Sequence, residues 1–201
     1  MRTIGALIFP GFELLDVFGP MEMFGLLSKD YELNLIAEHK GAIPSGQKLA
    51  AVADHSISDR SGFDILFIPG GAGTRREVEN PHLLTWIEKT AYHAEFVLSV
   101  CTGSALLAKT GILDNKHATT NKAAFKVVSQ GPKVNWVRQA RWIEDGKTLT
   151  SSGVSAGMDM SLGAISIMHG IERARKVAMW SEYDWHEDSN WDPFAKVHGL
   201  V

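Results

Sequence analysis

The stretch "FVLSVCTGSALLAKTG", residues 96–111, decides the fold of this chain. An apolar run rich in strand-forming residues ends at the only cysteine, Cys101, and a run of small helix-forming residues follows it. A residue on such a sharp strand-to-helix turn projects beyond the end of its strand. The stretch therefore predicts a buried strand, a tight turn at Cys101, and a helix that ends near Gly111.

Cys101 has two interpretations. Most free cysteines are small buried hydrophobes. The position favours a nucleophile instead, because the N-terminal amides and the positive dipole end of the following helix would point at the sulfur. We therefore expect the pKa of this thiol to lie below about 8.5, and we expect Cys101 to be largely thiolate at neutral pH and readily oxidised to the sulfinic acid.

Further alternating elements surround this stretch. We expect strands at residues 3–9, 31–37, 63–68, 95–100 and 117–120, and a hairpin at residues 134–152 with its turn at Asp145-Gly146; we expect helices at residues 14–28, 81–91 and 102–113, with one or two more in residues 155–183. Residues 41–60 have weak periodicity and predict a small hairpin or an irregular excursion. Apolar strands separated by helices indicate an α/β fold with a mostly parallel sheet covered on both faces.

The composition is that of a globular protein. The 201 residues are 45% hydrophobic and 21% charged, with no repeat or low-complexity linker, and we expect a single domain over residues 1–201. The net charge of −3 does not indicate a nucleic-acid-binding surface, and no apolar run reaches the length of a membrane span. The first apolar run is short, lacks a cleavage-site pattern, and ends at Pro10-Gly11. With a single cysteine, these features predict a cytoplasmic protein without membrane or nucleic-acid partners.

The loop "PGGAG", residues 69–73, follows the strand at 63–68. It matches neither the GxGxxG fingerprint nor a P-loop, so nucleotide binding is not indicated. A glycine cluster is usually a bare turn, but the backbone here could also approach a ligand. In that case the N–H groups of Gly71 and Thr102 would hold a developing negative charge, and Gly70 and Ala72 would belong to the substrate pocket.

Asp16 lies among apolar neighbours in "GFELLDVFGP", residues 11–20. It is either a solvated helix position or a buried acid with a raised pKa, and the residues alone leave both open. The eight histidines have no ligand spacing and there is no cysteine pair, so we expect no metal site. The acidic and aromatic segment "SEYDWHEDSNWDPF", residues 181–194, could cover a partner surface, but a packed tail is favoured slightly.

Four stretches together resemble the ThiJ/PfpI superfamily, whose members are similar to class I glutamine amidotransferases, over almost the whole chain. They are "PGFELLDVFGPMEMF" (10–24), "DILFIPGGAG" (64–73), "SVCTGSALLAKTGILDNKHATTN" (99–121), and "LTSSGVSAGMDMSLG" (149–163), which includes the pocket candidate Gly153. The resemblance implies a flavodoxin-like three-layer α/β sandwich with a cysteine nucleophile elbow. It also implies a homodimer with the site near the interface, for which the aromatic tail supplies surface.

Asp16 together with Cys101-Thr102 resembles the isonitrile-hydrating members of the superfamily. This resemblance implies that Cys101 attacks the terminal carbon of an isonitrile, that Asp16 is the acid/base, and that a thioimidate is hydrolysed to an N-substituted formamide. Such covalent catalysis needs no metal or organic cofactor. Many other members carry a histidine directly after the cysteine, where this chain has Thr102, which argues against a Cys-His dyad.

Two alternatives stay open, because a fold does not fix a function. One is a cofactor-free glyoxalase that acts on 2-oxoaldehydes. The other is a thiol redox sensor or ligand-binding protein without catalysis. The same segments also resemble the ligand-sensing half of AraC-type regulators, which continue into a helix-turn-helix domain; because this chain ends at Val201, we expect an enzyme rather than such a regulator.

Overall fold

The computed structural model describes residues 1–60, 62–131 and 133–201. Its main sheet has the strand order β10-β11-β7-β6-β1-β2-β5. These strands span Trp142–Asp145 (β10), Thr148–Ser151 (β11), Phe96–Ser99 (β7), Ile65–Ile68 (β6), Arg2–Leu7 (β1), Tyr31–Ala37 (β2) and His55–Ser56 (β5). Every pairing is parallel except that of β10 with β11, which form an antiparallel hairpin. Asp145 pairs with Thr148, so the turn is at Gly146-Lys147, one position later than predicted. The predicted mostly parallel α/β sheet is confirmed.

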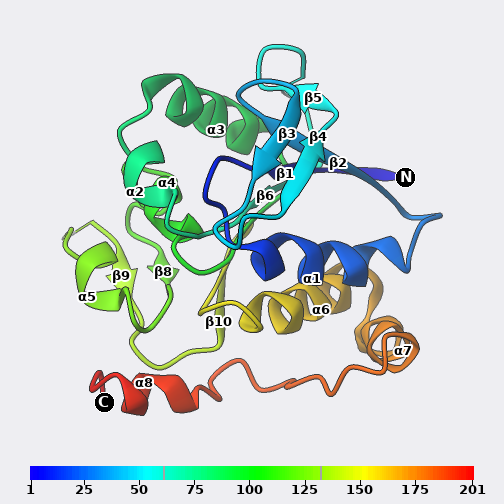
Figure 1. The fold of residues 1–201 in the computed structure, drawn as a ribbon. Coiled ribbons are helices and arrows are strands. Elements are labelled where there is room, and N and C mark those ends of the chain that lie inside the picture. The colour runs from blue at the N-terminus through cyan, green and yellow to red at the C-terminus, as the bar shows by residue number, and fades with distance from the viewer. Residues whose placement is uncertain (61, 132) are drawn as a thin grey trace.

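Helices cover both faces of this sheet (Figure 1). On one face lie α1 (Leu14–Gly25) and α6 (Ala156–His169), followed by α7 (Ile171–Trp180). On the other face lie α2 (Thr74–Glu77), α3 (Pro81–His93) and α4 (Gly103–Lys109). The central strands β6 and β7 are buried over nearly their whole length, as the near-continuous apolar pattern requires of a sheet with two covered faces.

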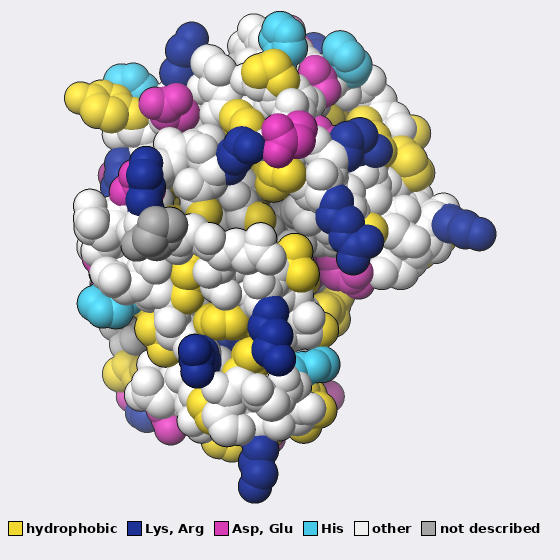
Figure 2. Space-filling model, turned by 90° about the vertical axis from the view of Figure 1, so that its left-hand side faces the viewer, with side chains coloured by type: hydrophobic (Ala, Val, Ile, Leu, Met, Phe, Trp, Pro, Cys, Tyr) yellow, Lys and Arg dark blue, Asp and Glu magenta, His cyan; other side chains and the backbone are white. Residues whose placement is uncertain are grey.

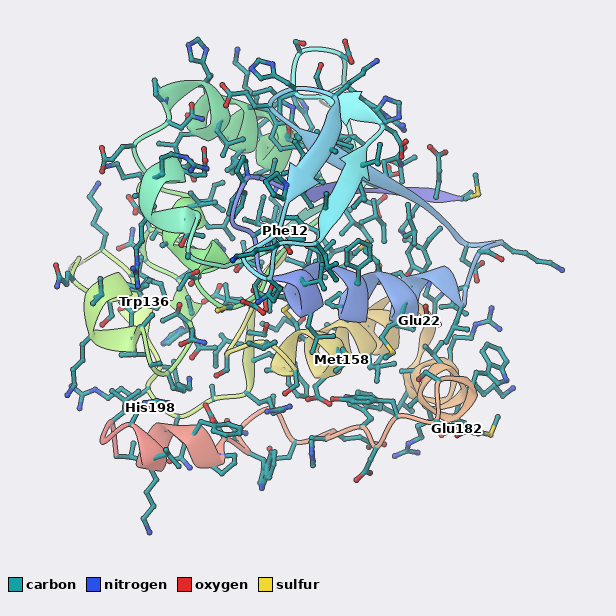
Figure 3. The ribbon with its side chains drawn as sticks, viewed as in Figure 1. Phe12, Glu22, Trp136, Met158, Glu182 and His198 are labelled. Carbon is teal, nitrogen blue, oxygen red and sulfur yellow. The ribbon has the colours of Figure 1, made fainter. Side chains whose placement is uncertain are left out.

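Helices α1 and α6 pack closely because small residues face their partners. A Cβ atom at Gly19 of α1 would lie 2.8 Å from Met158 Cγ of α6, and Figure 3 shows Met158 on the side of α6 that faces α1. The break between α6 and α7 falls at Gly170, whose φ of 87° suits glycine. This packing holds the start of α1 close to the carboxyl ends of the strands.

Some predicted elements differ from the observed ones. The helix expected at 14–28 ends at Gly25, and the one expected at 102–113 runs only from Gly103 to Lys109. The segment 41–60 contains a hairpin of β3 (Gly41–Pro44) and β4 (Ala50–Ala53) and then the edge strand β5. Three short helices were not expected, namely α2, α5 (Phe125–Val128) and α8 (Pro193–Val197). The strand at 117–120 is the two-residue β8 (His117–Ala118), which pairs with β9 (Asn135–Trp136).

The tail after α7 packs along the chain itself. Tyr183 Oη and the backbone N–H of His186 both donate to the carboxylate of Asp159 in α6. Farther along, Ala195 and Leu200 form a small apolar cluster with Phe125 of α5, and Figure 3 shows Trp136 beside that helix. The interpretation of residues 181–201 as a packed tail therefore agrees with the structure.

Candidate functional site

Cys101 occupies the sharp turn between β7 and α4. Its φ is 57°, in the left-handed region that side chains other than glycine rarely adopt, at a cost on the order of 1–3 kcal/mol. The turn is held on both sides, because Cys101 N donates to Ser152 O at 2.9 Å and Gly103 N donates to Val100 O at 2.9 Å. The predicted strand-turn-helix geometry is therefore present, and it directs the sulfur beyond the carboxyl end of the sheet.

Glycines allow the turn at Cys101 to pack closely against the loop 69–73. A Cβ atom on Gly70 would lie 2.5 Å from Thr102 N, and one on Gly103 would lie 2.5 Å from Ile68 O. Both distances are too short for any other residue without displacement of the backbone. The loop "PGGAG" thus lies directly against Cys101-Thr102.

Asp16 lies in the first turn of α1 and is completely buried. Gly70 N donates to its Oδ2 at 2.8 Å, which links the glycine loop to the carboxylate. Its Oδ1 is buried and has no hydrogen-bond partner among the described residues, and the charge of this carboxylate acts on the Cys101 thiol. Of the two interpretations of Asp16, the buried acid is the one observed.

The environment sets the protonation of this pair. Burial raises the pKa of Asp16 to about 7, although the hydrogen bond from Gly70 lowers it. Burial also raises the pKa of the Cys101 thiol to about 12, and the negative charge of Asp16 raises it further. The side chain that ionises near neutral pH is therefore the carboxyl group of Asp16.

The expectation of a thiolate at neutral pH is thus wrong. Helix α4 has only seven residues, and Cys101 is 6% exposed, so loss of water outweighs the effect of the helix end on the pKa of the thiol. Hydrogen bonds from Thr102 and from the Asn121 side chain oppose this increase in the pKa but do not cancel it. Cys101 is a thiol beside a proton acceptor.

The two predicted amide donors have different partners. The backbone N–H of Thr102 lowers the pKa of the Cys101 thiol, in opposition to the effect of burial. Gly71 N instead donates to Thr102 Oγ1 at 3.1 Å, and Thr74 Oγ1 lies 3.0 Å from the same oxygen. The Gly71 amide therefore holds the side chain of Thr102 in this structure.

Asn121 was missed by the sequence reasoning. Its Oδ1 accepts from Ala124 N at 3.1 Å, and its side chain lowers the pKa of the Cys101 thiol. Thr120 Oγ1 donates to Cys101 O at 2.9 Å and ties this loop to the elbow. The sequence offered one signal, because Asn121 belongs to the stretch 99–121 that also contains Cys101. Only the fold shows that Asn121 and Cys101 line the same cleft.

A buried ion pair lies directly behind Asn121. Lys122 Nζ is 3.1 Å from Asp192 Oδ2 and donates to Thr119 Oγ1 at 2.6 Å. Asp192 also begins α8, because its Oδ1 accepts from Phe194 N at 3.0 Å. This ion pair therefore holds the packed tail against the loop that contains Asn121.

A cleft of about 1010 Å³ opens from Cys101 between α2, α4 and α5. Figure 2 shows hydrophobic side chains inside a hollow on this side of the molecule, with Lys and Arg side chains around its edges. Gly71, Ala72, Thr102 and Asn121 line the cleft. Gly70 lies behind it, bonded to Asp16, and Gly153 lines a smaller pocket of about 240 Å³ that shares Asn121 with the cleft.

Neither a metal centre nor a membrane span is found in the part of the chain that the structure describes. No group of three or more His, Cys, Asp or Glu side chains there gathers closely enough to hold a metal ion. Within the same residues, no helix has the length and apolar character to cross a bilayer. The chemistry available at Cys101 is that of a thiol, a carboxyl group and several hydrogen-bond donors.

Comparisons with known proteins agree with this geometry. An isonitrile hydratase from Pseudomonas putida is 31% identical over 181 residues, which cover 90% of this chain and 78% of the relative. The HTH-type transcriptional regulator CdhR from Pseudomonas aeruginosa is 25% identical over 86% of this chain, which spans 52% of the regulator. A crystal structure of a ThiJ/PfpI family protein from Pseudomonas syringae, 27% identical, superimposes with a TM-score of 0.85 and covers 92% of this chain and 76% of that one.

The family model that matches the chain extends over residues 2–166, from the first strand into α6. This range includes Asp16, the glycine loop, the cysteine elbow and Asn121. With the nucleophile elbow and the mostly parallel sandwich already described, the match leaves one assignment: this chain belongs to the DJ-1/PfpI family.

Proposed function

We propose that this protein hydrates isonitriles to N-substituted formamides, with Cys101 as the nucleophile and Asp16 as the acid/base. One observation carries the proposal, namely the buried Asp16 carboxyl group, whose pKa burial raises to about 7 and whose charge raises the pKa of the Cys101 thiol. A catalytic acid/base works best when its pKa lies near the working pH. Similarity to the Pseudomonas putida isonitrile hydratase supports the choice of substrate class.

The first half-reaction uses the pair as one unit. The sulfur of Cys101 bonds to the terminal carbon of R–N≡C while the thiol proton passes to ionised Asp16. Asp16 then delivers that proton to the same carbon, and the product is the thioimidate R–N=CH–S–Cys. This order suits the observed environment, because a thiol with a raised pKa needs a base beside it.

The second half-reaction consumes one water. Asp16 takes a proton from the water as its oxygen bonds to the thioimidate carbon, and that proton moves to the nitrogen. The carbon–sulfur bond of the resulting adduct then breaks, the remaining hydroxyl proton returns to sulfur, and R–NH–CHO leaves. Hydrogen bonds from the Thr102 backbone and the Asn121 side chain would stabilise negative charge on the departing sulfur.

Formamide formation from cyclohexyl isonitrile, measured by liquid chromatography with mass detection, tests the proposal. Wild type should form the formamide, and Cys101→Ala should form none while it keeps the native circular dichroism spectrum. Asp16→Asn should lose on the order of a hundredfold or more in rate, the usual contribution of a positioned acid/base. The exposed Asp54→Asn is the matched control and should retain full activity.

The alternatives predict different results from the same sample. Conversion of methylglyoxal to lactate without formamide formation would support the glyoxalase function. Turnover of neither substrate would support a thiol sensor or ligand-binding protein, a class to which similarity with the regulator CdhR also points. Full activity of Asp16→Asn in the isonitrile assay would refute the mechanism even if formamide is formed.

A further inference from the structure

The walls of the cleft at Cys101 are apolar and built from small side chains. Three helices supply them over the outer part of the cleft. The apolar lining residues of these helices and the loop before α5 include Val78, Ala105, Ala108, Ala124, Val127 and Val128. The cleft is therefore wide because alanines face it, and its surface suits hydrocarbon.

Two observations indicate that this apolar surface awaits a ligand. Val127 of α5 is 72% exposed although it borders the cleft, so part of the wall has no protein partner. Ala105 and Ala108 are three positions apart on α4 and therefore share one face of that helix. Side chains larger than alanine at these positions would fill the cleft.

The charged residues that line the cleft largely balance one another. Lys109 Nζ pairs with Glu79 Oε1 at 2.9 Å, which balances two of the charges there. The remaining charged lining residue is Arg75, which is exposed on α2. The charged groups thus lie at the edge, and a ligand that extends outward from the polar groups around Cys101 would meet mainly apolar side chains.

Cys101 lines the cleft but is itself largely covered. Cys101 is only 6% exposed, so only a slender group reaches it. The linear –N≡C group fits this restriction, and its substituent would then lie outward in the cleft of about 1010 Å³. That volume is in the range that holds a drug-sized ligand, far more than a methyl or ethyl group needs.

We propose that the substrates are isonitriles with long or bulky hydrocarbon substituents, which the cleft between α2, α4 and α5 binds. This inference rests on the proposed isonitrile hydration. Each buried methylene group should raise kcat/KM by about fourfold, which corresponds to about 0.8 kcal/mol, until the chain fills the cleft. Methyl isonitrile should be a poor substrate.

The test measures kcat/KM for n-alkyl isonitriles from methyl to octyl with wild type and Ala108→Trp. In Ala108→Trp, the preference for octyl over methyl isonitrile should be at least tenfold smaller than in wild type. The matched control is Ala42→Trp on the exposed strand β3, which should keep the full preference. An unchanged preference in Ala108→Trp would overturn the proposal.

A second variant and a binding measurement keep the test decisive. Val127→Glu changes an exposed residue, so it should fold normally, and it should raise KM for octyl isonitrile but not for methyl isonitrile. Calorimetric binding of N-octylformamide and N-methylformamide needs no turnover. Tighter binding of the octyl compound to wild type than to Ala108→Trp supports the cleft even if isonitrile hydration fails, whereas equal binding of both formamides to wild type refutes it.

Discussion

Asp16 and Cys101 illustrate how burial can reverse an expectation based on local sequence. The strand-to-helix turn suggested a stabilised thiolate, but the sulfur lies beside a buried carboxylate and away from water. Both pKa values are raised, and the pair holds a proton that could move between the two groups. The site thus suits a thiol that gives up its proton during attack more than one that is ionised beforehand.

The raised pKa of Asp16 makes a prediction about stability. This carboxyl group has a pKa of about 7 in the folded state and about 3.8 when unfolded, so the unfolded chain loses its proton first as pH rises. Stability from this group is therefore present at low pH and is lost between about pH 4 and pH 7. The difference of about three units corresponds to a cost on the order of 4 kcal/mol above pH 7.

Asp16→Asn should remove this cost, because asparagine can still accept the hydrogen bond from Gly70 N. Urea unfolding should show the variant to be more stable than wild type at pH 8 and nearly equal to it at pH 4. Asp54→Asn serves as the exposed control and should show no such dependence. Parallel stability profiles for wild type and Asp16→Asn would contradict the assignment of a raised pKa to Asp16.

Short elements, more than long ones, complete the surroundings of Cys101. Helix α8 has five residues and α5 has four, and neither would be stable alone. They are held by a few long-range contacts, including the buried pair of Lys122 and Asp192. Since Lys122 follows Asn121 directly, the tail contributes to the position of a residue that contacts the sulfur.

Asp192→Asn should destabilise the fold by about 3–5 kcal/mol in urea unfolding, because it leaves the ammonium group of Lys122 buried without its counter-charge. Asparagine keeps an acceptor for Phe194 N, so the start of α8 is preserved. The double variant Lys122→Met/Asp192→Asn should recover most of the loss. Glu79→Gln breaks an exposed pair and should cost less than about 1 kcal/mol, and an equally small effect of Asp192→Asn would refute this account.

The molecule as a whole exposes apolar side chains away from the cleft. Leu15 and Phe18 are exposed on α1, and Leu49 and Val52 are exposed in or beside the β3–β4 hairpin. Phe18 also borders a surface hollow of about 510 Å³. Exposed apolar groups of this kind often mark a surface that another chain covers.

The expected assembly is a homodimer with the site near the interface. Light scattering at micromolar concentration should give twice the mass of the 22.0 kDa chain. Phe18→Glu should shift the sample toward monomer if α1 is in the interface, because it places a charge in an apolar contact. A monomer for wild type at that concentration would contradict the expected dimer.

Features with short-range causes were predictable from the sequence. The apolar runs and their intervening helices predicted the mostly parallel sheet, and "SVCTGS" predicted the elbow, because neighbouring residues determine a strand, a turn and a helix start. The hairpin turn after β10 was predictable to within one position for the same reason. The helices α2, α5 and α8 were not, since elements of four or five residues are too short for a periodicity to show.

Only the tertiary structure decided the electrostatics and the extent of the site. Asp16 meets Gly70, which is 54 positions away, and the burial of both Asp16 and Cys101 comes from elements far apart in the chain. A pKa depends on the water that packing removes and on charges that folding brings near, neither of which a local pattern contains. For that reason the sequence identified Cys101 and Asp16 as the candidate nucleophile and acid, whereas the fold determined that burial raises the pKa of the thiol, that Asn121 lies at the same cleft, and where that cleft lies.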